Sequence, residues 1–163
     1  MIRKTRHAHT NYEMAIPFCR QADKHDGCIR CTSEGFMDLS VEKLYYNDSF
    51  GNPVYSFCHW GKQNGDAMRD PDLTFSINAK EETIIPLTFQ NDYLGLYQEV
   101  FKEAGGKTVY SRSLLTDLDK FFWNWLKNIY NQGFKPDIFR RDEDEEAEQE
   151  KEFTLEEFAA AYC

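Results

Sequence analysis

Apolar and polar residues alternate in five short stretches, which is the two-residue period of a β-strand with one buried face. Residues that favour turns separate the stretches, as at residues 47–53 and 63–71. Short connections favour antiparallel neighbours, because a parallel pair needs a crossover of about a dozen residues. Pro86 indicates that the last stretch lies at an edge of the sheet. The predicted strands cover residues 28–32, 37–46, 54–60, 73–77 and 84–89.

After residue 110 the pattern changes to the period of a helix. Thr116 is placed to cap a helix that Gly133 ends, with Pro136 beyond this stop. The large apolar residues recur every three or four positions, so they form one stripe that would dock the helix on the sheet. The stripe comprises Leu118, Phe121, Phe122, Trp125, Leu126 and Ile129.

Both ends of the chain are predicted to lie outside this unit. Residues 1–27 indicate a polar basic arm with a short helix at most, because Asn11 could cap one and Pro17 would interrupt it. Residues 142–163 indicate an acidic tether followed by a short C-terminal helix. Between them, residues 28–141 are expected to form a single α+β domain: a twisted antiparallel sheet of four to six strands with one long helix packed on a face.

The short C-terminal helix has its own start signal. Thr154 and Glu157 form a capping box, and the following apolar positions share one face. A helix of about ten residues is marginal alone, so we expect it to dock on this domain, on a second copy or on a partner. The shared face comprises Leu155, Phe158, Ala159 and Tyr162.

Negative charge is concentrated near the C-terminus. The formal net charge is −9, from 28 acidic and 19 basic residues, and residues 142–157 hold ten of the acids against Lys151. The rest of the chain therefore balances 18 acids with 18 bases. Such a block repels phosphate groups, and it suits either a solvated spacer or a surface for a basic partner.

Several classes of function are disfavoured by composition. No stretch has the roughly 18 to 20 apolar residues of a membrane-spanning helix, and no secretory signal opens the chain, so we expect a cytoplasmic protein with five reduced cysteines. Trp60, Tyr93 and Tyr97 could stack on bases, but no basic stripe accompanies them. The sequence therefore predicts neither membrane insertion nor direct nucleic-acid binding, and it leaves the oligomeric state open.

Four segments resemble a domain family of unknown function found in phage, plasmid and other mobile-element accessory proteins of bacteria. The two most specific are QNGDAMRDP at residues 63–71 and QNDYLGLYQE at residues 90–99, and the resemblance spans roughly residues 28–134. It implies a bacterial or phage cytoplasmic setting and no known activity.

A zinc site is one candidate for chemistry. The pattern C-x5-H-x2-C-x2-C supplies thiolate and imidazole ligands that can close a tetrahedral site. Against this, a strand over residues 28–32 would turn its two cysteines to opposite faces, and non-ligating cysteines are favoured. The four residues are Cys19, His25, Cys28 and Cys31.

A divalent metal in a hydrolase is the alternative function. Carboxylates that converge from two loops, with a histidine, can bind Mg²⁺ or Mn²⁺ and activate water. Aspartates at turns also cap backbone N–H groups, and Arg69 can neutralise one of them, so a structural role is favoured. The candidate ligands are Asp66, Asp70 and Asp92 with His59, and Asp72 is a further donor.

A non-enzymatic binding protein is the first hypothesis. A Gln-Asn pair precedes Asp66 and another precedes Asp92, and two such loops side by side could bind a host protein or a small polar ligand. If the amides bond to each other instead, the loops form a structural clasp. Both versions require the two corners to be neighbours in space. The candidate binding residues are Gln63, Asn64, Asp66, Arg69, Asp70, Gln90, Asn91, Asp92 and Tyr93.

Overall fold

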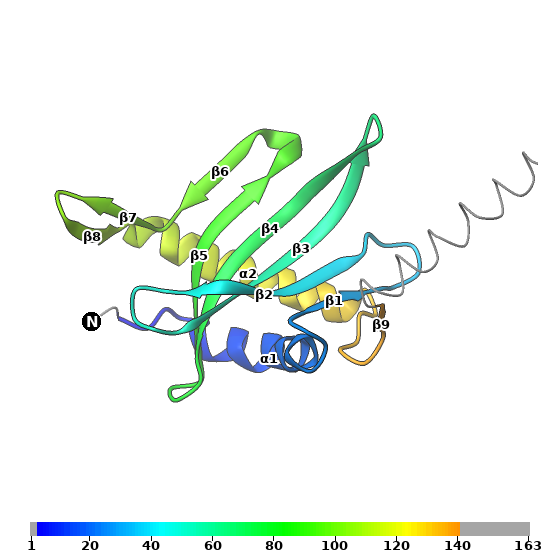
Figure 1. Cartoon of the computed structure of the whole chain (residues 1–163), viewed down its shortest axis with the longest axis horizontal. Coiled ribbons are helices and arrows are strands. Elements are labelled where there is room, and N and C mark those ends of the chain that lie inside the picture. The colour runs from blue at the N-terminus through cyan, green and yellow to red at the C-terminus, as the bar shows by residue number, and fades with distance from the viewer. Residues whose placement is uncertain (1–2, 141–163) are drawn as a thin grey trace, which may run out of the picture.

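The computed structural model describes residues 3–140 and has an α+β fold, as the sequence predicts (Figure 1). Seven strands form an antiparallel sheet in the order β6-β5-β4-β3-β2-β1-β9, and β7 and β8 form a separate hairpin. The strands are β1 (Cys28–Cys31), β2 (Leu39–Asn47), β3 (Pro53–Gln63), β4 (Asp66–Asn78), β5 (Thr83–Asn91), β6 (Leu96–Glu99), β7 (Phe101–Ala104), β8 (Lys107–Tyr110) and β9 (Phe139–Arg140).

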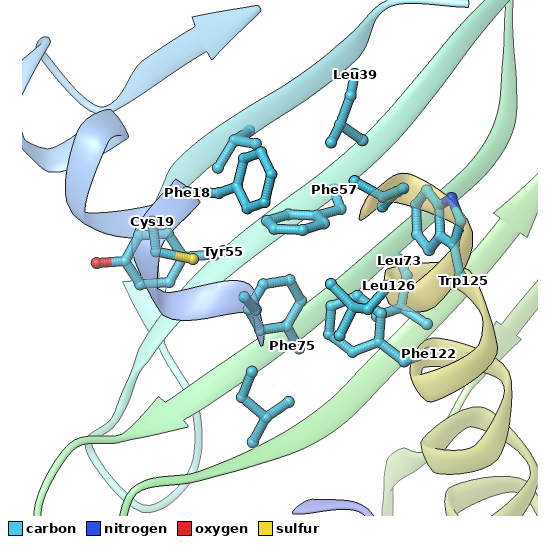
Figure 2. Close-up of a cluster of buried hydrophobic side chains, with 14 of the residues drawn as sticks. Phe18, Cys19, Leu39, Tyr55, Phe57, Leu73, Phe75, Phe122, Trp125 and Leu126 are labelled. Carbon is cyan, nitrogen blue, oxygen red and sulfur yellow. The ribbon is translucent and has the colours of Figure 1, made fainter. Parts of the chain in front are cut away.

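Two helices, α1 (Ala8–Lys24) and α2 (Arg112–Asn131), cover one face of the sheet. Phe57 on β3 connects them, because its ring contacts Phe18 of α1 and both Phe122 and Trp125 of α2, with centroids 5.6 to 6.3 Å apart (Figure 2). Fully burying a side chain of this size stabilises the fold by roughly 1.5–3 kcal/mol. The core therefore forms a single layer between the sheet and both helices.

The prediction that residues 1–27 hold at most a short helix is wrong. Helix α1 has 17 residues and continues through Pro17. A proline inside a helix costs about 3 kcal/mol, since it removes a hydrogen bond and crowds the preceding turn. Buried side chains on both sides of Pro17 offset this cost, among them Tyr12 and Phe18. Asn11 does not cap the helix; it is buried within it and donates to the carbonyl oxygen of Asp119.

Asp119 on α2 holds the start of α1. Its carboxylate is 2% exposed and accepts hydrogen bonds from the Thr5 hydroxyl at 2.6 Å and from the His7 backbone N–H at 3.0 Å. His7 is the N-cap of α1 and makes no side-chain cap of its own. A carboxylate from the neighbouring helix therefore satisfies a backbone donor that helix starts leave open.

Helix α2 begins earlier than predicted. Ser111 is its N-cap and accepts a hydrogen bond from the Leu114 backbone N–H, whereas Thr116 lies inside the helix and donates to the Arg112 carbonyl. The predicted apolar stripe does face the core, and Gly133 ends the helix with a φ of 87°. The start was misplaced because Thr116 and Ser111 are both acceptable caps in sequence.

The sheet is larger than the predicted four to six strands. Strand β5 lies at the edge only in part: β6 pairs with residues 88–91 of β5, whereas the first half of β5 has no strand on its outer side within residues 3–140. Pro86 is tolerated because it lies outside this paired part and next to a bulge in the β4–β5 ladder. The predicted acidic tether at residues 142–157 and the helix that starts at Thr154 lie outside the described residues.

Candidate functional site

The face of the sheet turned away from the two helices is polar. Side chains alternate along each strand, so the neighbours of the buried Phe57 on β3, Ser56 and Cys58, point to the other side. We call this surface the open face. The strand registers place its residues in two rows: Arg30, Ser40, Cys58, Asp72, Gln90 and Tyr97 in one, and Cys28, Glu42, Ser56, Thr74, Thr88 and Glu99 in the next.

Asp72 lies near the middle of the open face. It is half-buried and accepts a hydrogen bond of 2.8 Å from the hydroxyl of Ser56. Burial raises the pKa of its carboxyl above the ordinary value, and the Ser56 hydrogen bond and the charge of Arg69 oppose that shift. Burial therefore disfavours the charged form of the Asp72 carboxyl, which costs folding stability wherever that carboxyl is ionised.

Two exposed tyrosines accompany Asp72. Tyr46 is 53% exposed and Tyr97 is 55% exposed. Partial burial raises the pKa of both phenols; the negative charge of Asp72 adds to the shift for both, and that of Glu99 adds more for Tyr97. The two phenols therefore stay neutral near a carboxylate, each offering a ring face and one O–H donor.

Cys58, beside Asp72 in the first row, is not a nucleophile. It is 3% exposed, burial raises the pKa of its thiol far above the ordinary value, and Asp72 adds to the rise. Because the thiolate is the reactive form, a thiol held protonated is inert.

The hairpin that joins β3 to β4 and the bend after β5 are neighbours, as the binding hypothesis requires. Asp92, in the short 3₁₀ turn Asp92–Leu94, accepts hydrogen bonds from the Arg69 backbone N–H at 2.8 Å and from Arg69 Nε at 3.1 Å. These bonds hold the pKa of the Asp92 carboxyl below its ordinary value, the backbone bond most strongly. Figure 1 shows this bend beside the long β3–β4 hairpin.

The second Gln-Asn pair belongs to this contact. The amide of Asn91 donates to Asp70 at 2.8 Å, and its oxygen accepts from the Leu94 backbone N–H. Gln90 donates to the free oxygen of Asp92 at 3.2 Å. We call this set of hydrogen bonds the clasp, since it ties the bend to β4. The amides of Gln90 and Asn91 are used within the fold, but they bond to Asp92 and Asp70 and not to the amides of the first Gln-Asn pair, which the structural alternative required.

Tyr93 extends the clasp to β3. Its hydroxyl donates to the Lys62 carbonyl at 3.2 Å, and its ring lies over Gly61. A Cβ at residue 61 would lie 2.5 Å from the Tyr93 hydroxyl oxygen and would displace that side chain, so glycine is favoured here for space and not for a positive φ. This role of Gly61 has no signal in the sequence, because the residue directly follows the predicted strand at residues 54–60 and carries no pattern that marks a close contact.

The first Gln-Asn pair has a different environment. Asn64 and Gly65, with φ of 53° and 86°, make a two-residue turn, so the predicted turn at residues 63–71 is shorter than expected and β4 begins at Asp66. Gln63, Asn64 and Asp66 are exposed, and they form no side-chain hydrogen bond or ion pair with residues 3–140. The two pairs are therefore not equivalent: one lies within the clasp, and the other is presented to solvent at the hairpin tip.

The proposed hydrolase ligands are not brought together. His59 is 6% exposed on the helix side of β3, against Trp125 and Phe134, and burial lowers the pKa of its imidazole. Asp92 is bound to Arg69 at the rim. Over residues 3–140, no group of three or more His, Cys, Asp or Glu side chains could share a metal ion.

The proposed zinc ligands are also separate. Cys19 faces the core from α1, and the His25 ring packs on Phe139. Cys28 and Cys31 belong to strand β1, where Cys31 is buried on the helix side and Cys28 lies on the open face. Their spacing fits a zinc knuckle, but an extended strand points the two thiols apart.

Together, these features define an α+β domain with one helix-covered sheet face, one open polar face and a clasped rim. A family described as Domain of unknown function (DUF6908) matches residues 15–135, and the chain belongs to this family. The expected membership of an uncharacterised domain family is thus confirmed. No curated protein and no solved structure matches the chain. Within residues 3–140, neither helix has the length and apolar character needed to cross a membrane.

Proposed function

We propose that this protein is a non-enzymatic binding protein whose open face receives a basic segment of a protein partner. The observation that carries the proposal is the open face itself, which spans six strands and lies under neither helix. Its two rows hold three carboxylates, Glu42, Asp72 and Glu99, against one cation, Arg30. A surface of this charge favours a partner rich in lysine or arginine.

Asp72 gives the partner a specific contact. The carboxylate has no cation within 4.0 Å among residues 3–140, and burial outweighs the attraction of the more distant Arg69. A cation of the partner beside Asp72 would stabilise that charge, and the rings of Tyr46 and Tyr97 offer faces on which a lysine or guanidinium group can rest. A charge that costs folding stability but binds a ligand is typical of functional sites.

The hairpin tip provides a second contact region. Gln63 and Asn64 are exposed and each carries both donors and acceptors, so they can bind a peptide backbone. Gln90 and Asn91 instead hold the rim rigid through the clasp. In this version of the two-loop hypothesis, the hairpin tip contacts the partner and the bend after β5 supports the rim.

The biological setting belongs to the proposal as well. The motifs at residues 63–71 and 90–99 support an accessory protein of a phage or mobile element that acts in the cytoplasm of its bacterial host. The ten acids of residues 142–157 would add long-range attraction for a basic host or phage protein.

Site-specific photo-crosslinking in bacterial cells tests the proposal. A photoreactive phenylalanine analogue replaces Tyr97 on the open face or, as the matched control, Tyr110, which is 38% exposed on the β7–β8 hairpin. We expect a crosslink from Tyr97 alone, to a peptide with several lysine or arginine residues. Absence of a crosslink at Tyr97, or the same product from both positions, would contradict the proposal.

A further inference from the structure

A cavity of about 650 Å³ lies where β5 begins, at a distance from the clasp. Its apolar lining comes from Ile84 and Ile85 of β5, Ala8 of α1 and Leu115 of α2. This volume is within the range of sites that bury a ligand or several large side chains.

The apolar lining is left open because the sheet is incomplete there. Strand β6 pairs with residues 88–91 of β5, so the first half of β5 has no strand on its outer side within residues 3–140. Phe50, from the turn between β2 and β3, lines the same cavity and is 56% exposed. An exposed aromatic ring beside an apolar hollow marks a surface that binds another apolar group.

The rim of the cavity carries positive charge. Arg3, Lys4 and Glu81 line it, so two cations face one carboxylate, and Lys4 lies 3.8 Å from Glu81 in an exposed ion pair. An exposed pair of this kind contributes little and leaves Lys4 available to other carboxylates. An occupant with apolar side chains and acidic neighbours would therefore complement the cavity.

We propose that the C-terminal segment of the same chain, residues 153–162, is this occupant and binds back on its own domain. The segment has the required chemistry, because Leu155, Phe158 and Tyr162 share one face of the helix that its capping box predicts. Glu156 and Glu157 lie in the segment, and eight further acids precede it in residues 142–152. These charges are opposite to those of Arg3 and Lys4.

The connecting chain is long enough. Five strand spacings separate β9 from β5 across the sheet, which corresponds to about 24 Å. The registers also place Arg140 level with Gln90, six residues or about 20 Å along β5 from Ile84, so the straight separation is about 31 Å. The twelve residues 141–152 can span about 40 Å when extended. The segment can therefore reach the cavity of its own domain without a second copy. The inference concerns a surface other than the open face, and it stands whether or not the proposed basic partner exists.

Paramagnetic relaxation enhancement on the full chain tests this inference. A spin label is attached to Cys163 in a Cys28→Ser background. The other three thiols, Cys19, Cys31 and Cys58, are buried with raised pKa values and resist labelling. We expect the label to reduce the amide signals of residues 83–85 and of Phe50 by at least about half, while signals of the hairpin tip stay unchanged.

Two variants and one mixing experiment make the outcome decisive. Phe158→Asp should abolish the signal loss, whereas Ala160→Asp, which adds the same charge on the opposite helix face, should leave it in place. The inference would be overturned if the signals of residues 83–85 and Phe50 were not reduced, if other residues were affected instead, or if the signal loss remained in Phe158→Asp. So would broadening of unlabelled ¹⁵N-protein by an equal amount of labelled ¹⁴N-protein, since the segment would then bind a second copy.

Discussion

The hydrogen bonds of the clasp predict how much stability is lost when Asp92 is substituted. The two hydrogen bonds from Arg69 are charge-assisted and would each contribute about 1.5–3 kcal/mol if buried. The Asp92 side chain is 20% exposed and that of Arg69 is 40% exposed, so solvent screening reduces each bond to about 1 kcal/mol or less. Asp92→Ala should therefore lower the free energy of unfolding by about 1.5 kcal/mol, and Asp92→Asn, which keeps the shape, by about 1 kcal/mol.

Equilibrium urea unfolding, followed by tryptophan fluorescence, measures this loss. A change of 1 kcal/mol corresponds to a shift in melting temperature of roughly 2–4 °C for a chain of this length. The matched control is Asp66→Asn on the same hairpin, since Asp66 is exposed and forms no side-chain hydrogen bond with residues 3–140. We expect this control to stay within about 0.5 kcal/mol of the native chain.

The stabilising contribution of Asp92 should also depend on pH in a defined direction. The pKa of Asp92 is lowered in the folded protein, so its contribution is fully present above the unfolded value of about 3.9 and is lost as pH falls through the folded value. The native chain and Asp92→Asn should therefore differ at pH 6–7 and converge as the pH drops below about 4. Equal losses from Asp66→Asn and Asp92→Asn, or a difference that persists in acid, would refute this account of the clasp.

Three further substitutions test other parts of the fold by the same unfolding measurement. Gly61→Ala should cost about 1 kcal/mol by displacing Tyr93 and its hydrogen bond to Lys62, and should cost less in a Tyr93→Ala background; equal costs would contradict the close contact. Asp119→Ala should cost about 3 kcal/mol and speed amide exchange at the start of α1, and a loss below about 1 kcal/mol would contradict the anchoring role. Pro17→Ala should stabilise by about 1 kcal/mol or more, and destabilisation would mean that the ring's packing outweighs the missing hydrogen bond.

Strong local signals allowed much of the sheet to be predicted. The alternation at residues 54–60 and 73–77 predicts the central parts of β3 and β4, although the turn between them is shorter than predicted, and the stripe around Phe122 predicts the buried face of α2. The alternating residues that form the open face can also be read from each strand, for example Ser56 and Cys58 on β3 or Asp72 and Thr74 on β4. Which of them are neighbours across the sheet depends on the register between the strands. No single stretch of sequence predicts that register.

Features set by tertiary contacts could not be predicted. Helix α1 crosses Pro17 because the sheet buries its apolar face, and Asp119 supplies its cap from more than a hundred residues away. The short strands β6 to β8 lack a clear two-residue period, since most of their residues are exposed on both faces. The partners of Asp92 were ambiguous because turn aspartates bind metals, backbone N–H groups and arginine equally well in sequence.

The role of Asp72 is tested most directly by a single substitution with two measurements. Asp72→Asn removes a charge that burial disfavours and keeps an oxygen for the Ser56 hydrogen bond, so at pH 7 the free energy of unfolding should rise by up to about 1 kcal/mol. This gain should shrink as pH falls below the folded pKa, where the native carboxyl also becomes neutral.

The affinity of the same variant for the partner captured through Tyr97 decides the central claim. We expect binding to weaken at least about tenfold, equivalent to 1.4 kcal/mol, because the partner's cation loses its counter-charge on the open face. A variant that is more stable and binds less well would show that Asp72 is kept for recognition. Unchanged affinity would contradict the account, and so would a loss of stability that matches the loss of binding.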